Sequence, residues 1–121
     1  MMMTETSKIL EIGDEAKEMA GIGMLILFGD QAPVGLREYC LIHDQGQKIE
    51  TLVENDKLLL GEHQYTVEHV GKTAVESFNT IGHVTLKFNQ SEDVLSGSIH
   101  LKEELKEFPG LKDEIVFLTN A

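Results

Sequence analysis

Five histidines form the most reactive set of side chains in this sequence, which has one cysteine and no glycine-rich nucleotide-binding motif. They are His43, His63, His69, His83 and His100. No two of them lie two or four residues apart, the spacings that bring two metal ligands together on one strand or helix. On an extended strand, His63 and His69 would be separated by about 20 Å. The spacing therefore predicts no metal site. A site assembled from different strands, such as one that combines His43 with His83, stays open but has no support in the spacing.

His43 is the candidate nucleophile. It follows the apolar run Tyr39–Ile42 and precedes Asp44 and the turn at Gly46. A histidine at the end of a strand can have one ring nitrogen fixed by a backbone or carboxylate acceptor and the other presented to solvent, which suits nucleophilic chemistry. The pattern alone is more typical of a half-buried histidine whose nitrogens are hydrogen-bonded. For a reactive residue we expect an exposed ring.

His83 begins the alternating segment His83–Phe88 and is expected on its polar face, together with Thr85. By pattern alone it is an exposed residue at a strand edge. His63 and His100 are likewise expected to face solvent.

Two further placements follow from strand alternation. His69 is expected to share a face with Tyr65 and Val67. Cys40 is expected to be a small core residue whose side chain points away from His43.

The elements that must position these side chains are short. Segments rich in leucine or β-branched residues, separated by glycine and acidic turns, predict a mainly β protein. We expect a single domain over residues 1–121, folded as a small β-barrel of about 7–9 short strands with two or three short helices. The expected strands are Ser7–Ile12, Met24–Phe28, Tyr39–His43, Lys48–Val53, Lys57–Leu60, Gln64–Val70, His83–Phe88, Ser98–Leu101 and Ile115–Leu118. The expected helices are Asp14–Ala20, Pro33–Glu38, and one that begins at the capping box Thr73–Glu76 and ends at Gly82.

Composition restricts the partners. The 121 residues carry 10 Lys and Arg against 21 Asp and Glu, a net charge of -11, which argues against nucleic acid and favours basic protein surfaces. No apolar run approaches the roughly 18 residues of a membrane span, so membrane insertion is not expected. A single cysteine cannot form an internal disulfide, which fits the cytoplasm.

Several segments resemble a known family in their order and spacing. The sequence from about Ile9 to Phe88 is similar to the glucitol/sorbitol-specific enzyme IIA component of the bacterial phosphotransferase system. The matching segments are Ala32-Pro33, Glu38–His43, Gly61–Val67, Val70-Gly71 and Gly82–Phe88.

The resemblance implies a small β-barrel that works as a phosphotransferase without a cofactor. Members accept a phosphoryl group from the phosphorylated carrier HPr on a histidine and pass it to a cysteine of the IIB part of the sugar permease. The acceptor falls on His43, usually through Nε2, and His83 matches a second histidine for which we infer a supporting role. Some members have Cys and His where this chain has Asp44 and Gln45. The functions of these two residues and of Cys40, the transported polyol and the oligomeric state stay open.

Two hypotheses follow. In the first, the chain is a phosphocarrier with His43 as the covalent intermediate, assisted by backbone N–H groups near Gly46 or Gly82 or by Lys87 as phosphate ligands. In the second, it is an acidic barrel that binds a protein or a sugar and is never phosphorylated. Under the first, His43→Ala is expected to abolish phosphoryl acceptance at little cost in stability, because a solvent-facing ring buries little area.

Overall fold

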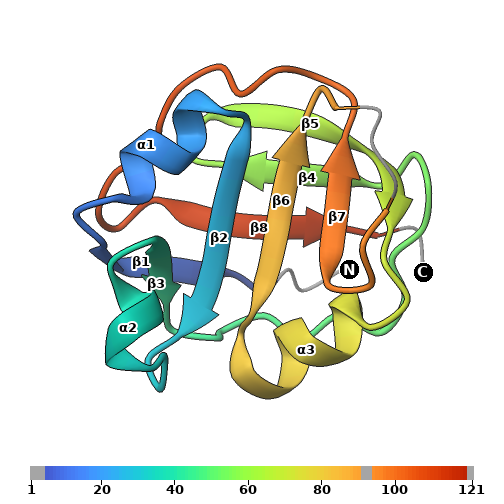
Figure 1. The fold of residues 1–121 in the computed structure, drawn as a ribbon. Coiled ribbons are helices and arrows are strands. Elements are labelled where there is room, and N and C mark those ends of the chain that lie inside the picture. The colour runs from blue at the N-terminus through green and yellow to red at the C-terminus, as the bar shows by residue number, and fades with distance from the viewer. Residues whose placement is uncertain (1–4, 91–93, 120–121) are drawn as a thin grey trace.

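The structure is a computed structural model that describes residues 5–90 and 94–119. Over these residues, eight strands close into a barrel in the order β1-β3-β2-β6-β7-β5-β4-β8, with three short helices around it (Figure 1). The predicted mainly β barrel is confirmed. The strands are β1 (Ser7–Ile12), β2 (Met24–Gly29), β3 (Cys40–His43), β4 (Lys57–Leu60), β5 (His63–Val70), β6 (Val84–Phe88), β7 (Ser98–Leu101) and β8 (Glu114–Leu118). The helices are α1 (Ala16–Gly21), α2 (Val34–Arg37) and α3 (Ala74–Ile81).

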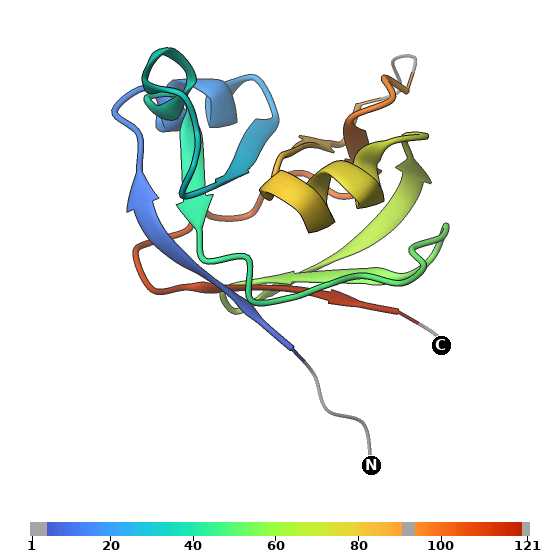
Figure 2. The same ribbon diagram turned by 90° about the horizontal axis from the view of Figure 1, so that it is seen from below.

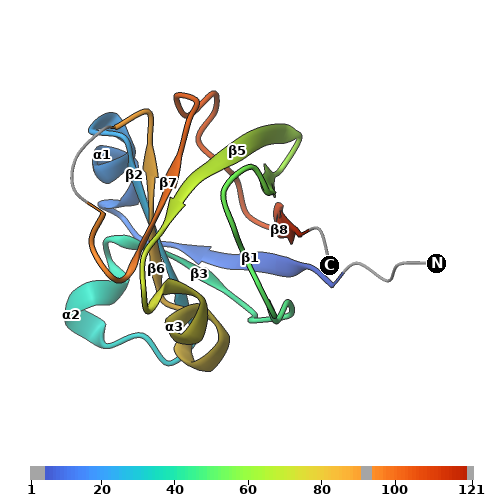
Figure 3. The ribbon, with the colours of Figure 1, turned by 90° about the vertical axis from the view of Figure 1, so that its right-hand side faces the viewer.

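Strand direction gathers the candidate residues at one end of the barrel. β2 and β3 pair in parallel, with Gly29 opposite His43, because the connection between them crosses back through α2. β6 is antiparallel to β2, so its first residue lies at the end where β2 and β3 finish. α2 and α3 lie at this same end, toward the viewer in Figure 2, whereas α1 lies at the other end (Figures 1 and 3). This end therefore combines two strand ends, a strand start and two helices.

Alternation along β2 and β3 divides their side chains between two apolar clusters. Leu25, Leu27 and Leu41 belong to the barrel interior. A second, outer cluster consists of Phe28, Ala32, Cys40 and Ile42, with Ile26 packed against it. The predicted burial of Cys40 is confirmed. Its side chain lies on the opposite face of β3 from that of Leu41, the next residue, which belongs to the barrel interior.

The helices begin and end close to the predicted positions. Gly82 ends α3 in the left-handed conformation, with φ of 74°, as expected for a glycine after the last helical turn. The predicted capping box is not formed, because the Thr73 hydroxyl donates to the carbonyl of Ser96 instead. Across the described residues, every helix falls short of the length and hydrophobicity that a transmembrane span requires.

The predicted strand Lys48–Val53 is absent. Side-chain amides, in place of a neighbouring strand, make the hydrogen bonds that attach this part of the chain. The side-chain amide of Asn79 on α3 accepts from the N–H of Ile49 at 2.9 Å and donates to its carbonyl at 2.7 Å. The buried amide of Gln47 makes the equivalent pair with Phe117 of β8, donating to its carbonyl at 2.7 Å and accepting from its N–H at 2.8 Å. The chain after β3 is thus attached to α3 and to β8.

Replacing Gln47 tests this attachment. Gln47→Ala leaves the N–H and the carbonyl of Phe117 unpaired in a buried place, and should lower the free energy of unfolding by about 1–3 kcal/mol. Urea unfolding measures the loss. Gln64→Ala, at an exposed position of β5, is the control and should stay within about 0.5 kcal/mol of wild type. Equal effects of the two substitutions would contradict this account.

Candidate functional site

His43 is buried at the end of the barrel. It is the last residue of β3, and its side chain has the inward direction of Leu41, two residues earlier. Its ring stacks on Phe78 of α3, with centroids 5.2 Å apart and planes 14° from parallel, and the residue is 0 % exposed. The predicted solvent exposure of His43 is therefore wrong, because strand alternation turns the ring inward and α3 covers it.

Two backbone groups hold the His43 ring. Nε2 lies 2.8 Å from the carbonyl oxygen of Gly82, and the N–H of Gln45 lies 3.1 Å from Nδ1. A carbonyl oxygen only accepts hydrogen bonds and a backbone N–H only donates them. This pattern assigns the ring proton to Nε2, which donates to Gly82, and leaves Nδ1 as the acceptor from Gln45. Both nitrogens of His43 are paired in this closed arrangement.

Glycine is needed where the backbone approaches His43. A Cβ on Gly82 would lie 2.9 Å from Nε2 and 2.6 Å from the nitrogen of Gly29. A Cβ on Gly29 would in turn meet the side-chain oxygen of Gln45. The turn after α3 therefore approaches both His43 and the end of β2 through its backbone, with no room for a Cβ at position 82.

The environment disfavours a charged ring. Burial lowers the pKa of His43 below its ordinary value of 6.5, and the positive charge of Lys48 acts in the same direction. The hydrogen bond to Gly82 and the carboxylate of Asp44 oppose this shift in pKa. Lys48 Nζ donates to the carbonyl of Asn79 at 2.9 Å, which places its ammonium group at the last turn of α3. The neutral imidazole needed for nucleophilic attack is thus the favoured form.

His83 is half-buried on the outer side of the barrel wall. It precedes β6, and its ring stacks on Phe28 of the outer cluster, with centroids 4.3 Å apart and planes 10° from parallel. Burial lowers its pKa. Within the described residues, no hydrogen bond or ring contact joins His83 to His43. Gly82 connects the two histidines. Its carbonyl accepts the hydrogen bond from His43, and His83 is the next residue in the chain.

The expected phosphate ligands do not present free N–H groups to His43. The N–H of Gly46 donates to the Asp44 carboxylate at 3.0 Å, and that of Gly82 donates to the carbonyl of Phe78. Lys87 pairs in register with Met24, the first residue of β2, and so lies toward the other end of the barrel.

Other reactive groups are accounted for elsewhere in the fold. Burial raises the pKa of the Cys40 thiol to about 11, which keeps it protonated and unreactive. His63 is partly exposed and pairs with Glu107 at 3.2 Å. The prediction that His100 faces solvent is wrong, since it is 0 % exposed.

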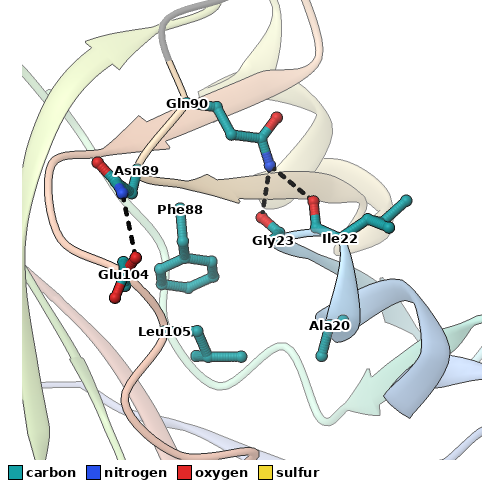
Figure 4. Close-up of a pocket in the computed structure, with 9 residues that line it drawn as sticks. Ala20, Ile22, Gly23, Phe88, Asn89, Gln90, Glu104 and Leu105 are labelled. Carbon is teal, nitrogen blue, oxygen red and sulfur yellow. Dashed lines mark hydrogen bonds between the residues drawn. The ribbon is translucent and has the colours of Figure 1, made fainter.

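An open cavity of about 350 Å³ lies at the opposite end of the barrel, near α1 (Figure 4). Phe88 and Leu105 supply its apolar lining, and the amide of Gln90 spans one side by donating to the carbonyls of Ile22 and Gly23. None of its lining residues is a histidine, so it contributes nothing to the chemistry of His43.

Comparison with known proteins connects this geometry to one family. A family model described as the PTS system glucitol/sorbitol-specific IIA component matches residues 4–116. The chain belongs to this family. It is 35% identical over 102 residues to the glucitol/sorbitol-specific EIIA components of Shigella flexneri and Escherichia coli (strain K12), which covers 84% of this chain and 83% of each relative. The crystal structure of a PTS system IIA component from Enterococcus faecalis V583 superposes with a TM-score of 0.87 at 28% identity, covering 94% of this chain and 99% of that one.

Three features of this IIA component escaped sequence reasoning: the stacking of Phe78 on His43, the carbonyl of Gly82 and the N–H of Gln45. The two hydrogen bonds come from backbone groups, which every residue has and no motif distinguishes. One sequence signal pointed to this contact: the glycine at position 82, which ends a predicted helix immediately before a second histidine.

Acidification should destabilise this IIA component through His43. Because its folded pKa is lowered, the unfolded chain takes up a proton first as the pH falls. The stability contributed by the neutral ring is complete above the unfolded pKa of 6.5 and is lost as the pH falls through that value toward the folded pKa. Urea unfolding at about pH 7.5 and about pH 5.5 should show a larger loss for wild type than for His43→Gln.

The difference between the two proteins is the informative quantity. The lowered pKa of His83 contributes a loss in the same direction, but that loss is common to both. Equal losses in wild type and His43→Gln would mean that His43 titrates as a solvated residue.

Proposed function

We propose that this chain is a phosphocarrier that accepts a phosphoryl group from phosphorylated HPr on His43 and passes it to the IIB cysteine of a polyol permease. Its relatives from Shigella flexneri and Escherichia coli are named glucitol/sorbitol-specific, so glucitol (sorbitol) is the proposed sugar. The observation that supports the proposal is the His43 ring, held in one tautomer by two backbone hydrogen bonds, at the residue for which the sequence resemblance implies the acceptor role. The proposed location is the cytoplasm, which suits a free buried thiol.

Nε2 is the proposed acceptor atom. In the closed form it carries the ring proton and has no lone pair for attack, so opening must include a change of tautomer that moves the proton from Nε2 to Nδ1. Nε2 then forms the bond to phosphorus as the bond from phosphorus to the donor histidine breaks, and the proton that Nδ1 afterwards loses balances the one that the departing donor ring gains. Nδ1 then has its lone pair again, so the phosphorylated ring can accept the hydrogen bond from the N–H of Gln45. Positioning and charge stabilisation suffice for this chemistry, without a cofactor.

The closed arrangement must open before transfer. Nε2 lies against the Gly82 carbonyl, and a ring that is 0 % exposed cannot meet a protein donor. The end of α3 is held to the loop after β3 by Lys48, whose ammonium donates to the carbonyl of Asn79, and by Gln45, whose amide donates to that of Thr80 at 3.4 Å. Both of these bonds are solvent-exposed and therefore inexpensive to break, whereas the part-buried pair between the Asn79 amide and Ile49 stays in place. We propose that movement of the Gly82 turn uncovers Nε2.

A cation, Lys48, lies near His43 in this acidic chain. A phosphoryl group adds negative charge to a chain whose formal charge is already -11. Lys48 supplies a cation close enough to affect the His43 pKa, and Asp44 opposes it. In the proposal, Lys48 exchanges the Asn79 carbonyl for a phosphoryl oxygen after transfer.

The first experiment replaces the acceptor. His43→Ala would remove a buried ring with two hydrogen bonds, and is now expected to cost on the order of 2–4 kcal/mol instead of leaving stability unchanged. His43→Gln is the better variant, because it fills more of the space with a polar side chain. Incubated with enzyme I, HPr and phosphoenolpyruvate, wild type should gain one phosphoryl group by intact mass, and His43→Gln should gain none.

His63→Gln is the matched control and should be phosphorylated normally, since His63 is partly exposed and pairs with Glu107 far along the sequence. Phosphorylation of a folded His43→Gln variant at the wild-type rate would place the acceptor on another residue.

The second experiment separates chemistry from packing at His83. We propose that its ring nitrogens stabilise the phosphoryl oxygens once the Gly82 turn has moved. Loss of one such donor should slow transfer by roughly 100-fold. His83→Phe keeps an aromatic ring to stack on Phe28 but has no nitrogen, whereas His83→Ala loses both. Rapid-quench measurement of phosphoryl acceptance should find both variants slow. Normal transfer by His83→Phe would restrict His83 to packing.

One observation favours the alternative function, a regulatory barrel that binds a protein or sugar and is never phosphorylated. Both nitrogens of His43 are already hydrogen-bonded and the ring is covered. Absence of any mass gain in wild type, with active enzyme I and HPr, would support this alternative.

A further inference from the structure

A β-bulge brings two histidines together on the barrel wall formed by β5 and β7. The register of this pair shifts between Val67 and His69, so that His69 lies opposite His100. Unbroken alternation would have placed His69 on the inward face with Val67, as the sequence predicted. The extra residue turns His69 outward, where its ring lies 6.1 Å from that of His100, with planes 70° apart.

His100 carries the one orphaned nitrogen among the buried side chains of the described residues. It is 0 % exposed, although its neighbours Ile99 and Leu101 point into the barrel and it points out. Its Nδ1 lies 3.3 Å from the carbonyl oxygen of Gln90, which assigns the ring proton to Nδ1. Nε2 therefore has a free lone pair, and it is buried without a hydrogen-bond partner. Buried polar atoms without a partner are rare, because leaving one unpaired is costly.

We propose that His69 and His100 bind a divalent transition metal ion, with Zn²⁺ as the ion of choice. Imidazole nitrogen is a preferred ligand of this ion. A histidine that binds metal through one nitrogen usually donates its other N–H to a backbone carbonyl or carboxylate, as Nδ1 of His100 does to Gln90. His69 is exposed, so rotation of its side chain can direct a ring nitrogen at the ion. Water completes the coordination.

The surroundings indicate an exchangeable site. Across the described residues, no group of three or more His, Cys, Asp or Glu side chains is arranged to hold a metal ion, so among these residues His69 and His100 are the proposed ligands. Lys87 of β6 lies opposite His100 on the side of β7 that faces away from His69. Its positive charge disfavours the binding of a divalent cation. Lys87 also pairs with the first residue of β2, whereas His43 lies opposite the last. The proposed metal site is therefore remote from the phosphoryl site and independent of it.

Calorimetric titration of the tag-free, metal-stripped chain with Zn²⁺ tests the proposal. We expect one ion per chain and a loss of affinity of at least about tenfold in His69→Gln. His69 is exposed, so this variant should fold normally, which its amide spectrum would verify. His63→Gln, also on β5, is the matched control and should bind Zn²⁺ like wild type.

A spectroscopic readout makes the test independent of the folding of any variant at His100. In histidine labelled with ¹⁵N, addition of Zn²⁺ should shift Nε2 of His100 and one nitrogen of His69, and leave both nitrogens of His43 in place. Absence of Zn²⁺ binding by wild type, unchanged affinity in His69→Gln, or unchanged His100 resonances would each overturn the proposal.

Discussion

The hydrogen bond from His43 Nε2 to the carbonyl of Gly82 organises the functional end of this barrel. It connects the last residue of β3 to the residue that ends α3 and leads into β6. It requires glycine at position 82, where φ is 74° and a Cβ would contact both the histidine and Gly29. The tautomer of the ring, the cover that Phe78 provides and the position of His83 all follow from it.

The same hydrogen bond stabilises the closed form and must break before the proposed phosphoryl transfer. In the closed form it satisfies a buried polar atom, and burial keeps the ring neutral by lowering its pKa. A phosphoryl acceptor must release this atom, so the proposed carrier alternates between a closed state and an open one. Exposed hydrogen bonds from Gln45 and Lys48 fasten the loop after β3 to the last turn of α3, together with the part-buried pair between the Asn79 amide and Ile49. Movement of the Gly82 turn that leaves the Asn79 pair in place can remain local while the barrel core stays intact.

The sequence was informative where a local pattern determines the structure. Alternation and turn residues identified the barrel and most of its strands, and Gly82 identified the end of α3. It was uninformative where contact with an element distant in the sequence determines the local structure. The burial of His43 depends on the docking of α3, and the segment after β3 lost its predicted strand to the side chains of Asn79 and Gln47. The bulge that turns His69 outward adds one residue to a strand, which no hydrophobic pattern marks.

The central claim is that Nε2 of His43 leaves Gly82 to take the phosphoryl group and that Nδ1 of the phosphorylated ring accepts the hydrogen bond from Gln45. NMR of the phosphorylated chain, with ¹⁵N-labelled histidine and amides, tests it most directly. The account predicts phosphorus coupled to Nε2 of His43, a large shift of the amides of Gly82 and His83, and a nearly unchanged amide of Gln45. Phosphorus on Nδ1 or on another histidine, or a Gly82 turn that does not respond to phosphorylation, would contradict it.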